Sequence, residues 1–259
     1  MKNSSLKLIT LNVWCGRSLY PLMRFFRKHK ETTDIFCLQE VSNTSQEVMD
    51  HGHPDEHSCG PLFEKISAEL KDFKGFFAHF EDNKDRMSQA MFVRKTVPLK
   101  TVQDFIVFQP ERPQEKGSTV FSPRKLQYIT VNWRNREVLV ANHHGLWNGG
   151  PKDDTPDRIA QSNSIKDFLD TFHGPKVLCG DFNLLPNTDS LGILEKGMRN
   201  LVKEFEAPST RTPLYRHYEN PDHSHFADYI LVSSEVNVKK FAVLSDIVSD
   251  HSPLFLEFL

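Results

Sequence analysis

The sequence lacks the features that mark membrane, zinc-finger and strongly charged proteins. None of its apolar runs approaches the ~20 residues of a membrane-spanning helix, and Lys7 and Asn12 interrupt the first apolar run, which excludes a signal-peptide core. Its four cysteines show no CxxC or Cys/His zinc spacing. The formal net charge is −2, so no global basic field draws the chain onto nucleic acid. We therefore expect a cytoplasmic protein without stable membrane insertion and without an evident protein partner.

What is present fits a globular protein of mixed secondary structure. With 259 residues, of which 38% are hydrophobic, the chain can bury a substantial core. Cys37 and Cys179 lie inside apolar runs, so we expect reduced, buried thiols that pack as small hydrophobes. The sequence contains no repeat, low-complexity tract or linker, and we predict one domain over residues 1–259.

Hydrophobic periodicity predicts many strands and few helices. Helical spacing occurs at residues 19–30, 62–70, 158–172 and 190–196. Short apolar or alternating runs predict strands at residues 6–13, 34–38, 75–80, 88–94, 102–107, 125–133, 137–142, 177–179, 227–232, 238–245 and 254–258. Because strands and helices do not alternate strictly, the pattern predicts an α+β sandwich with helices on its outer faces.

Polar side chains recur where these predicted strands end. They are Asn12, Glu40, His143, His144, Asp181, Asn183, Asp228, Asp250 and His251. Any one of them alone is more often a turn or cap residue than a functional one. If the ends share one edge, several carboxylates crowd together and repel one another, and a bound divalent cation relieves the repulsion. Oxygen ligands favour Mg²⁺ or Mn²⁺ over zinc, and histidines beside such an ion suit phosphate-ester hydrolysis.

The order of these motifs resembles the endonuclease/exonuclease/phosphatase superfamily, which has a deoxyribonuclease I-like fold. The motifs are Asn12, Gln39-Glu40, Asn142-His143-His144, Gly180-Asp181-Phe182-Asn183, Asp228-Tyr229-Ile230 and Ser249-Asp250-His251-Ser252-Pro253. The resemblance runs from Leu8 to the C-terminus. It implies a four-layered α/β/β/α sandwich of two mostly antiparallel sheets with helices outside, and a Mg²⁺- or Mn²⁺-dependent hydrolase of phosphate esters.

The resemblance also implies a role for each matching residue. Glu40 would be the main metal ligand, Asn12 would order Glu40 or bind the metal directly, and Asp250 would complete the acidic set. Asp181 would align or deprotonate the attacking water, and Asn183 would hold that water or a phosphoryl oxygen.

Two histidines complete the implied site. His251 would bond the scissile phosphate and be oriented by Asp228. His144 matches the other histidine of the family by its spacing from Asn142, and His143 is the competing assignment. Trp147 and Arg158 are further candidates for substrate contact, through stacking and through a non-scissile phosphate. Both also have a structural interpretation, as a packing tryptophan and as an arginine at a helix start.

Three functions remain open from the sequence. We favour a phosphodiesterase or nuclease-type activity on a nucleic acid or nucleotide-like substrate. The alternative is a phosphatase or phospholipase C-like hydrolase acting on inositol phosphate, sphingomyelin or another headgroup. A non-catalytic binding protein is the third, and it is disfavoured because every position expected to do chemistry carries a competent side chain.

Overall fold

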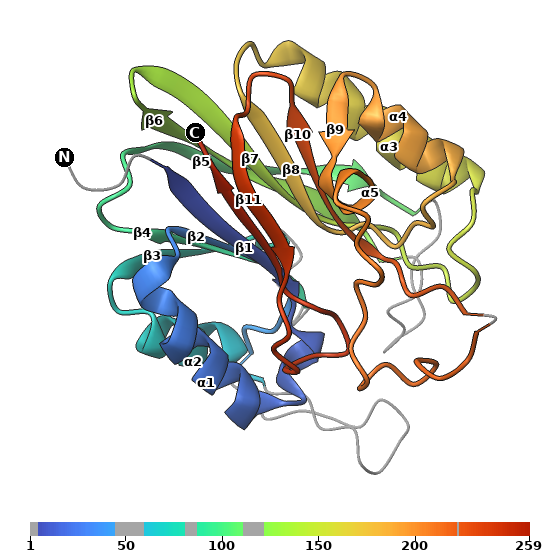
Figure 1. Cartoon of the computed structure of the whole chain (residues 1–259), viewed down its shortest axis with the longest axis horizontal. Helices are drawn as coiled ribbons and strands as arrows, with labels where there is room; N and C mark the ends of the chain where they lie inside the picture. Colours follow the sequence, from blue (N-terminus) through green and yellow to red (C-terminus); the bar gives the residue numbers. More distant parts are fainter. Residues whose placement is uncertain (1–4, 45–59, 81–86, 111–121, 222) are drawn as a thin grey trace.

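Two six-stranded sheets packed face to face form the centre of the protein (Figure 1). The computed structural model describes residues 5–44, 60–80, 87–110, 122–221 and 223–259. Helices α1 (Leu19–His29) and α2 (Leu62–Glu69) cover the outer face of one sheet, whereas α3 (Pro156–Thr171) and α4 (Asp189–Glu195) lie outside the other. None of the helices in these ranges is long and apolar enough to cross a membrane.

Each sheet contains one parallel pair of strands among antiparallel neighbours. The first sheet has the order β11 (Val238–Val243), β12 (Leu254–Phe258), β1 (Leu6–Asn12), β2 (Ile35–Val41), β4 (Ser88–Arg94) and β3 (Phe73–Phe77). The second has the order β5 (Leu99–Phe108), β6 (Arg124–Trp133), β7 (Arg136–His144), β8 (Lys176–Asp181), β10 (Asp228–Ser233) and β9 (Met198–Asn200). The parallel pairs are β1 with β2 and β7 with β8. The predicted four-layered sandwich with mostly antiparallel sheets is therefore confirmed.

Alternation along β1 shows how the two faces of the first sheet differ. Leu6 and Leu8 belong to the core between the sheets, whereas Ile9 and Leu11 belong to the core beneath α1 and α2. Because strand side chains alternate between faces, Asn12 lies on the same face as Leu6 and Leu8, toward the second sheet. The last residue of β1 thus carries its amide into the space between the sheets.

The boundaries of most predicted elements are correct to within a few residues. The largest omissions are the short β9 and α5 (Leu201–Glu204), which are too brief to show a period. Strands β7 and β8 also extend to His144 and Asp181, where the sequence predicted the strands to end earlier. These polar residues stay within the ladders because their side chains meet other polar groups between the sheets. Cys37 and Cys179 are buried free thiols, as expected.

Candidate active site

The ends of the two parallel strand pairs meet across the sandwich. Asn12 pairs with Gln39 at the end of β1, and His144 pairs with Asp181 at the ends of β7 and β8. Parallel strands finish at the same edge of a sheet, so the topology places these polar residues together. The amide of Asn12 donates from Nδ2 to Asp181 Oδ2 over 3.0 Å and thereby joins the two sheets.

Glu40 reaches this site because β2 is irregular at that position. Strict alternation from Leu38, which faces α1 and α2, would turn Glu40 to that same helix side and would point Val41 to the inner face, away from the helix-side core to which Val41 belongs. The register with β4 shifts between Leu38 and Val41, and Glu40 has a positive φ of 57°. This bulge aims the carboxylate at Asn12, whose Nδ2 donates to Glu40 Oε1 over 3.0 Å.

Asp228 and His251 come from β10 and from the segment that precedes β12. Asp228 begins β10 and pairs directly with Asp181 of β8. β12 runs antiparallel to β1 with Leu254 opposite Thr10, so the residues that precede β12 lie beyond Thr10, next to Asn12. His251 Nδ1 lies 2.9 and 2.8 Å from the two carboxylate oxygens of Asp228, and its Nε2 lies 3.7 Å from Asp181 Oδ2.

The donor set fits a divalent cation. Ligand atoms of Asp181, Asp228 and His251 all lie within 4.8 Å of one another, and Glu40 joins Asp181 through Asn12. Asn12 Oδ1 accepts from the backbone N–H of Trp14 over 2.9 Å, so this side chain orders Glu40 rather than presenting a free oxygen. Clustered carboxylate oxygens are the ligands that hard cations prefer. Among these residues, Glu40 would hold the ion, beside Asp181.

Asp250 forms an ion pair with a buried arginine at this site. Its Oδ2 lies 2.8 Å from Nη1 of Arg211, which is buried and whose guanidinium lies 4.5 Å from the ring of Tyr215. His251 Nε2 is 3.9 Å from the same carboxylate. An ion pair with a buried arginine already balances the charge of Asp250, so its part in a metal set stays a prediction.

The two histidines at the end of β7 point in different directions. Nε2 of His144 lies 3.9 Å from Glu40 Oε1 and 3.8 Å from Asp181 Oδ2. The His143 ring is buried against Phe182, with ring centroids 5.4 Å apart. Burial, and then the charge of Arg124, lower the pKa of His144 to about 3, so its imidazole is neutral at physiological pH. The geometry favours His144 over His143 as the residue that takes part in the site.

The backbone around Asp181 is packed too closely for larger residues. A side chain at Gly180, where φ is 139°, would collide with the carbonyl oxygen of His143, and one at Gly145 would collide with that of Phe182. Asn183, also in the left-handed region with φ of 52°, donates its backbone N–H to Asp181 Oδ1 over 3.0 Å. Its side-chain amide points toward the Gly145 carbonyl, 3.4 Å away. The GDFN motif thus fixes the orientation of Asp181.

Arg158 is buried beneath the loop that follows β7 and bonds that loop. Its guanidinium donates to the carbonyl oxygens of Pro151, over 2.7 Å, and of Asp153, and to Asn148 Oδ1 over 3.1 Å. Only 1% of the residue is exposed, so the predicted contact with a substrate phosphate has no support in this geometry. The interpretation as an arginine at a helix start fits better, because Arg158 stands in the first turn of α3. Trp147 is half-buried in the same loop.

Three cations are buried at the site, and Lys152 and Arg211 among them were not candidates from the sequence. Arg124 interacts electrostatically with Glu40 and Asp181, Arg211 pairs with Asp250, and Lys152 interacts with Asp181, Asp228 and Asp250. Each lies in an unremarkable sequence context, in a strand start or a polar loop. Only the convergence of distant segments gives them a common location, so no local signal could have found them.

These cations decide how the acidic groups ionise. Burial alone would raise the pKa of Asp181, but His251 and Lys152 outweigh it and lower that pKa well below its usual range. Burial and Arg211 disfavour a charged His251, yet Asp228 and the other carboxylates raise the pKa of His251 above its usual value. The site therefore pairs an ionised Asp181 with a histidine that tends to be protonated.

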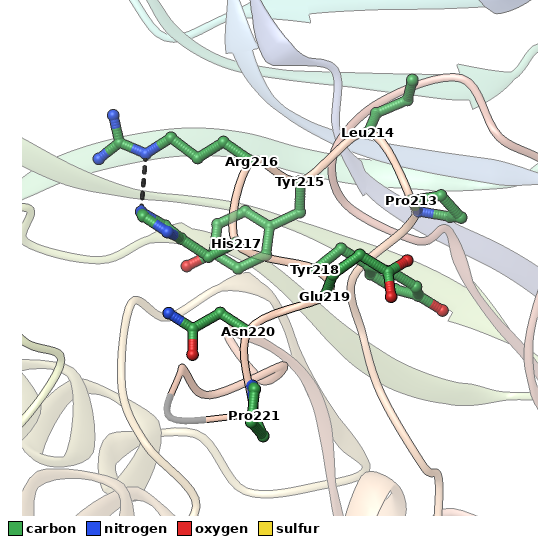
Figure 2. A pocket seen from close by; sticks show the side chains of 9 residues that line it. All are labelled: Pro213, Leu214, Tyr215, Arg216, His217, Tyr218, Glu219, Asn220 and Pro221. Carbon is green, nitrogen blue, oxygen red and sulfur yellow. Dashed lines mark hydrogen bonds between the residues drawn. The ribbon is translucent and has the colours of Figure 1, made fainter.

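A hollow of about 630 Å³ lies in the segment between α5 and β10, beside this site. Figure 2 shows the side chains that line it, from Pro213 to Pro221, with Arg216 hydrogen-bonded to the His217 ring. Tyr215 connects the hollow to the site, because it also stacks on Arg211. The hollow itself contains none of the carboxylates described above.

Comparisons with known proteins bear on the family and on the fold. The model of the endonuclease/exonuclease/phosphatase family matches residues 9–251. Human tartrate-resistant acid phosphatase type 5 is 27% identical over 222 residues, which are 81% of this chain and 67% of that protein. An endonuclease/exonuclease/phosphatase from Bacteroides vulgatus superposes with a TM-score of 0.72 at 18% identity and covers 99% of both chains. A mannosyl-6-phosphatase from Bacteroides thetaiotaomicron gives 0.71 at 20% identity, over 98% of this chain and 100% of that one.

Proposed function

The chain belongs to the endonuclease/exonuclease/phosphatase family, and from that premise we propose that it hydrolyses phosphate esters with a divalent cation, water and the pair Asp181 and His251. The observation that carries the proposal is the buried constellation in which His251 contacts Asp228 through Nδ1 and approaches Asp181 through Nε2. Family membership supports hydrolysis of phosphoesters in general. The ion, the residue roles and the substrate are our proposal.

Each of these residues has its own role in the proposed reaction. The ionised carboxylate of Asp181 accepts a hydrogen bond from the attacking water and takes its proton, and the water oxygen bonds to phosphorus. His251 donates Nε2–H to a non-bridging phosphoryl oxygen, where negative charge accumulates as the ester bond breaks. Asp228 accepts the Nδ1–H of His251 and so holds the ring in the donating orientation. His144 and Asn183 border the same space and would contact the phosphoryl group.

The acidic side of the site would hold the cation. Glu40 is the ligand best placed for it, because its side chain is 23% exposed and Asn12 fixes its carboxylate. When bound, Mg²⁺ or Mn²⁺ would neutralise the carboxylates and stabilise the charge that develops on the phosphoryl group. Asp250 would contribute to binding of the cation through its charge, since its nearest partner is Arg211.

A substrate panel tests this proposal. Bis-p-nitrophenyl phosphate, p-nitrophenyl phosphate, single- and double-stranded DNA, RNA, inositol phosphates and sphingomyelin would be assayed with Mg²⁺, Mn²⁺ and chelator. Asp181→Ala and His251→Ala should each lower kcat by at least ~100-fold. Asp170→Ala, which removes an exposed carboxylate of α3, is the control and should leave kcat unchanged. Near-normal turnover of Asp181→Ala or His251→Ala would contradict the assigned roles.

The panel also separates the two substrate classes. The sequence favoured a phosphodiester or nuclease-type substrate, and that stays a prediction. A phosphomonoester is the second candidate, which a specific feature of the structure supports: an additional buried cation, Lys152, close to the carboxylates. A cytoplasmic location likewise stays a prediction from the sequence.

A further inference from the structure

The ammonium group of Lys152 is buried beside the proposed active site without a bonding partner. Its Nζ is shielded from solvent and has no hydrogen-bond partner among the residues that the structure describes. It nevertheless lies close enough to Asp181, Asp228 and Asp250 to interact with all three electrostatically. A buried ammonium without a hydrogen-bond partner is costly, since its three N–H donors are unsatisfied. A ligand that accepts from these donors would remove that cost.

The loop that carries Lys152 is held rigidly in place. Arg158 bonds the carbonyl oxygens of Pro151 and Asp153, on either side of Lys152. The carbonyl of Lys152 itself accepts from the backbone N–H of Leu185, over 3.1 Å, in the segment after the GDFN motif. Asp154 accepts from the backbone N–H of Ser190 over 2.8 Å at the start of α4. The position of Lys152 is therefore set by its neighbours on both sides.

The charges that surround Lys152 bear on which phosphate ester it can bind. Asp181, Asp228 and Asp250 attract its ammonium, whereas Arg211 repels it. A divalent cation would add two positive charges to this site. A phosphodiester, which carries one negative charge, compensates half of them, whereas a phosphomonoester dianion compensates both. Uncompensated charge in a buried site is unfavourable.

We propose that Lys152 binds a non-bridging oxygen of a phosphomonoester dianion, so that this site prefers monoesters to diesters. The inference rests on the proposed function and names the substrate class of that same site. A monoester presents three terminal oxygens, which suffice for the cation, His251 and Lys152 together. A diester has two, so one of these three contacts is lost.

The test compares two esters that share a leaving group. We expect the wild-type chain with Mg²⁺ to hydrolyse p-nitrophenyl phosphate with a higher kcat/KM than bis-p-nitrophenyl phosphate. Lys152→Met, which removes the charge but keeps the length, should lower kcat/KM for the monoester by ~10–100-fold, the range for a hydrogen bond to a charged group. The loss of kcat/KM for the diester should stay below ~3-fold, because the diester carries only one negative charge. Lys152→Arg should retain most of the monoester activity.

Binding of inorganic phosphate provides a readout that does not depend on turnover. Titration calorimetry with phosphate at pH 7.5, in the presence of Mg²⁺, should show ~10–100-fold weaker binding to Lys152→Met than to the wild type. Lys239→Met is the matched control, because Lys239 is exposed on β11 in the first sheet. Since Lys152→Met removes an unpaired buried charge, it should fold at least as stably as the wild type. If it does not fold, Lys152→Gln serves the same comparison.

The outcomes distinguish this inference from the proposed function. If neither ester is hydrolysed with Mg²⁺ or Mn²⁺, the proposed function fails, while phosphate binding still tests Lys152. If both esters are hydrolysed and the diester is preferred, the monoester inference is wrong. An equal loss for both esters in Lys152→Met, or unchanged phosphate binding, would also overturn it.

Discussion

His251 and Asp228 form a buried pair in which both carboxylate oxygens face one ring nitrogen. The distances from Nδ1 to Oδ1 and Oδ2 are 2.9 and 2.8 Å, and the side chains are 5% and 3% exposed. A carboxylate accepts but cannot donate, so Nδ1 carries the proton. This pair leaves Nε2 directed at Asp181 and the proposed phosphoryl position.

Replacement of Asp228 by Asn tests the function of this pair. The amide keeps the size of the carboxylate but removes the charge that raises the pKa of His251, so less of the imidazolium is present. We expect kcat to fall by ~100-fold or more, with a smaller change in KM. The pH profile of kcat should also lose activity at a lower pH than in the wild type. Asp170→Asn serves as the exposed control, and an unchanged kcat in Asp228→Asn would contradict the assigned role.

Removal of the divalent cation tests the acidic side of the site. Exhaustive chelation should abolish hydrolysis of every active ester, and added Mg²⁺ or Mn²⁺ should restore it. Glu40→Gln should raise the metal concentration needed for half-maximal activity by at least ~10-fold. Direct Mn²⁺ binding, followed by electron paramagnetic resonance, should weaken in parallel. Activity that survives chelation would refute the metal requirement.

His143 should make the protein less stable in mild acid. Burial, and then the neighbouring His144, lower the pKa of His143 to about 3, whereas the ordinary value is 6.5. Between these values the unfolded chain binds a proton that the folded chain excludes, so stability falls as the pH drops below about 6.5. At pH 5 the loss amounts to about 2 kcal/mol for one such histidine.

His143→Gln should reduce this pH dependence. The difference in unfolding free energy between pH 7 and pH 5 would be measured by urea denaturation in both proteins. We expect the decrease to be about 2 kcal/mol smaller in the variant. His173→Gln, at an exposed position after α3, should leave the decrease as it is in the wild type. Identical pH dependence in His143→Gln would show that His143 is not excluded from protonation.

Gln39 and Asn142 should stabilise the contact between the two sheets. Gln39 Nε2 donates to Asn142 Oδ1 over 2.7 Å, and Asn142 Nδ2 donates to the Leu38 carbonyl over 3.0 Å, all in a buried setting. Asn142→Leu removes both buried bonds and should lower the free energy of unfolding by about 1–3 kcal/mol. Gln39→Leu combined with Asn142→Leu should cost less than the sum of the single changes. Strict additivity would show that the two amides act independently.

Local patterns predicted the sandwich because each strand and helix shows its own hydrophobic period. They also located Asp181, Asn183, Asp228 and His251, since these residues directly follow or precede apolar runs. Glu40 was a candidate for the same reason, as a polar residue after a predicted strand. The bulge that aims its carboxylate could not be predicted, because it depends on the register between β2 and β4, which is a property of two paired strands.

The sequence by itself determined which elements form and which acidic residues stand at their ends, because hydrophobic periodicity and turn chemistry are local. Only the tertiary structure decided which charges meet. Lys152, Arg124 and Arg211 come from separate segments, and their interactions with the carboxylates depend on how the two sheets pack. The structure likewise placed Arg158 beneath a loop and His144 toward Glu40, because side-chain direction follows from packing across the sandwich rather than from neighbours in the chain.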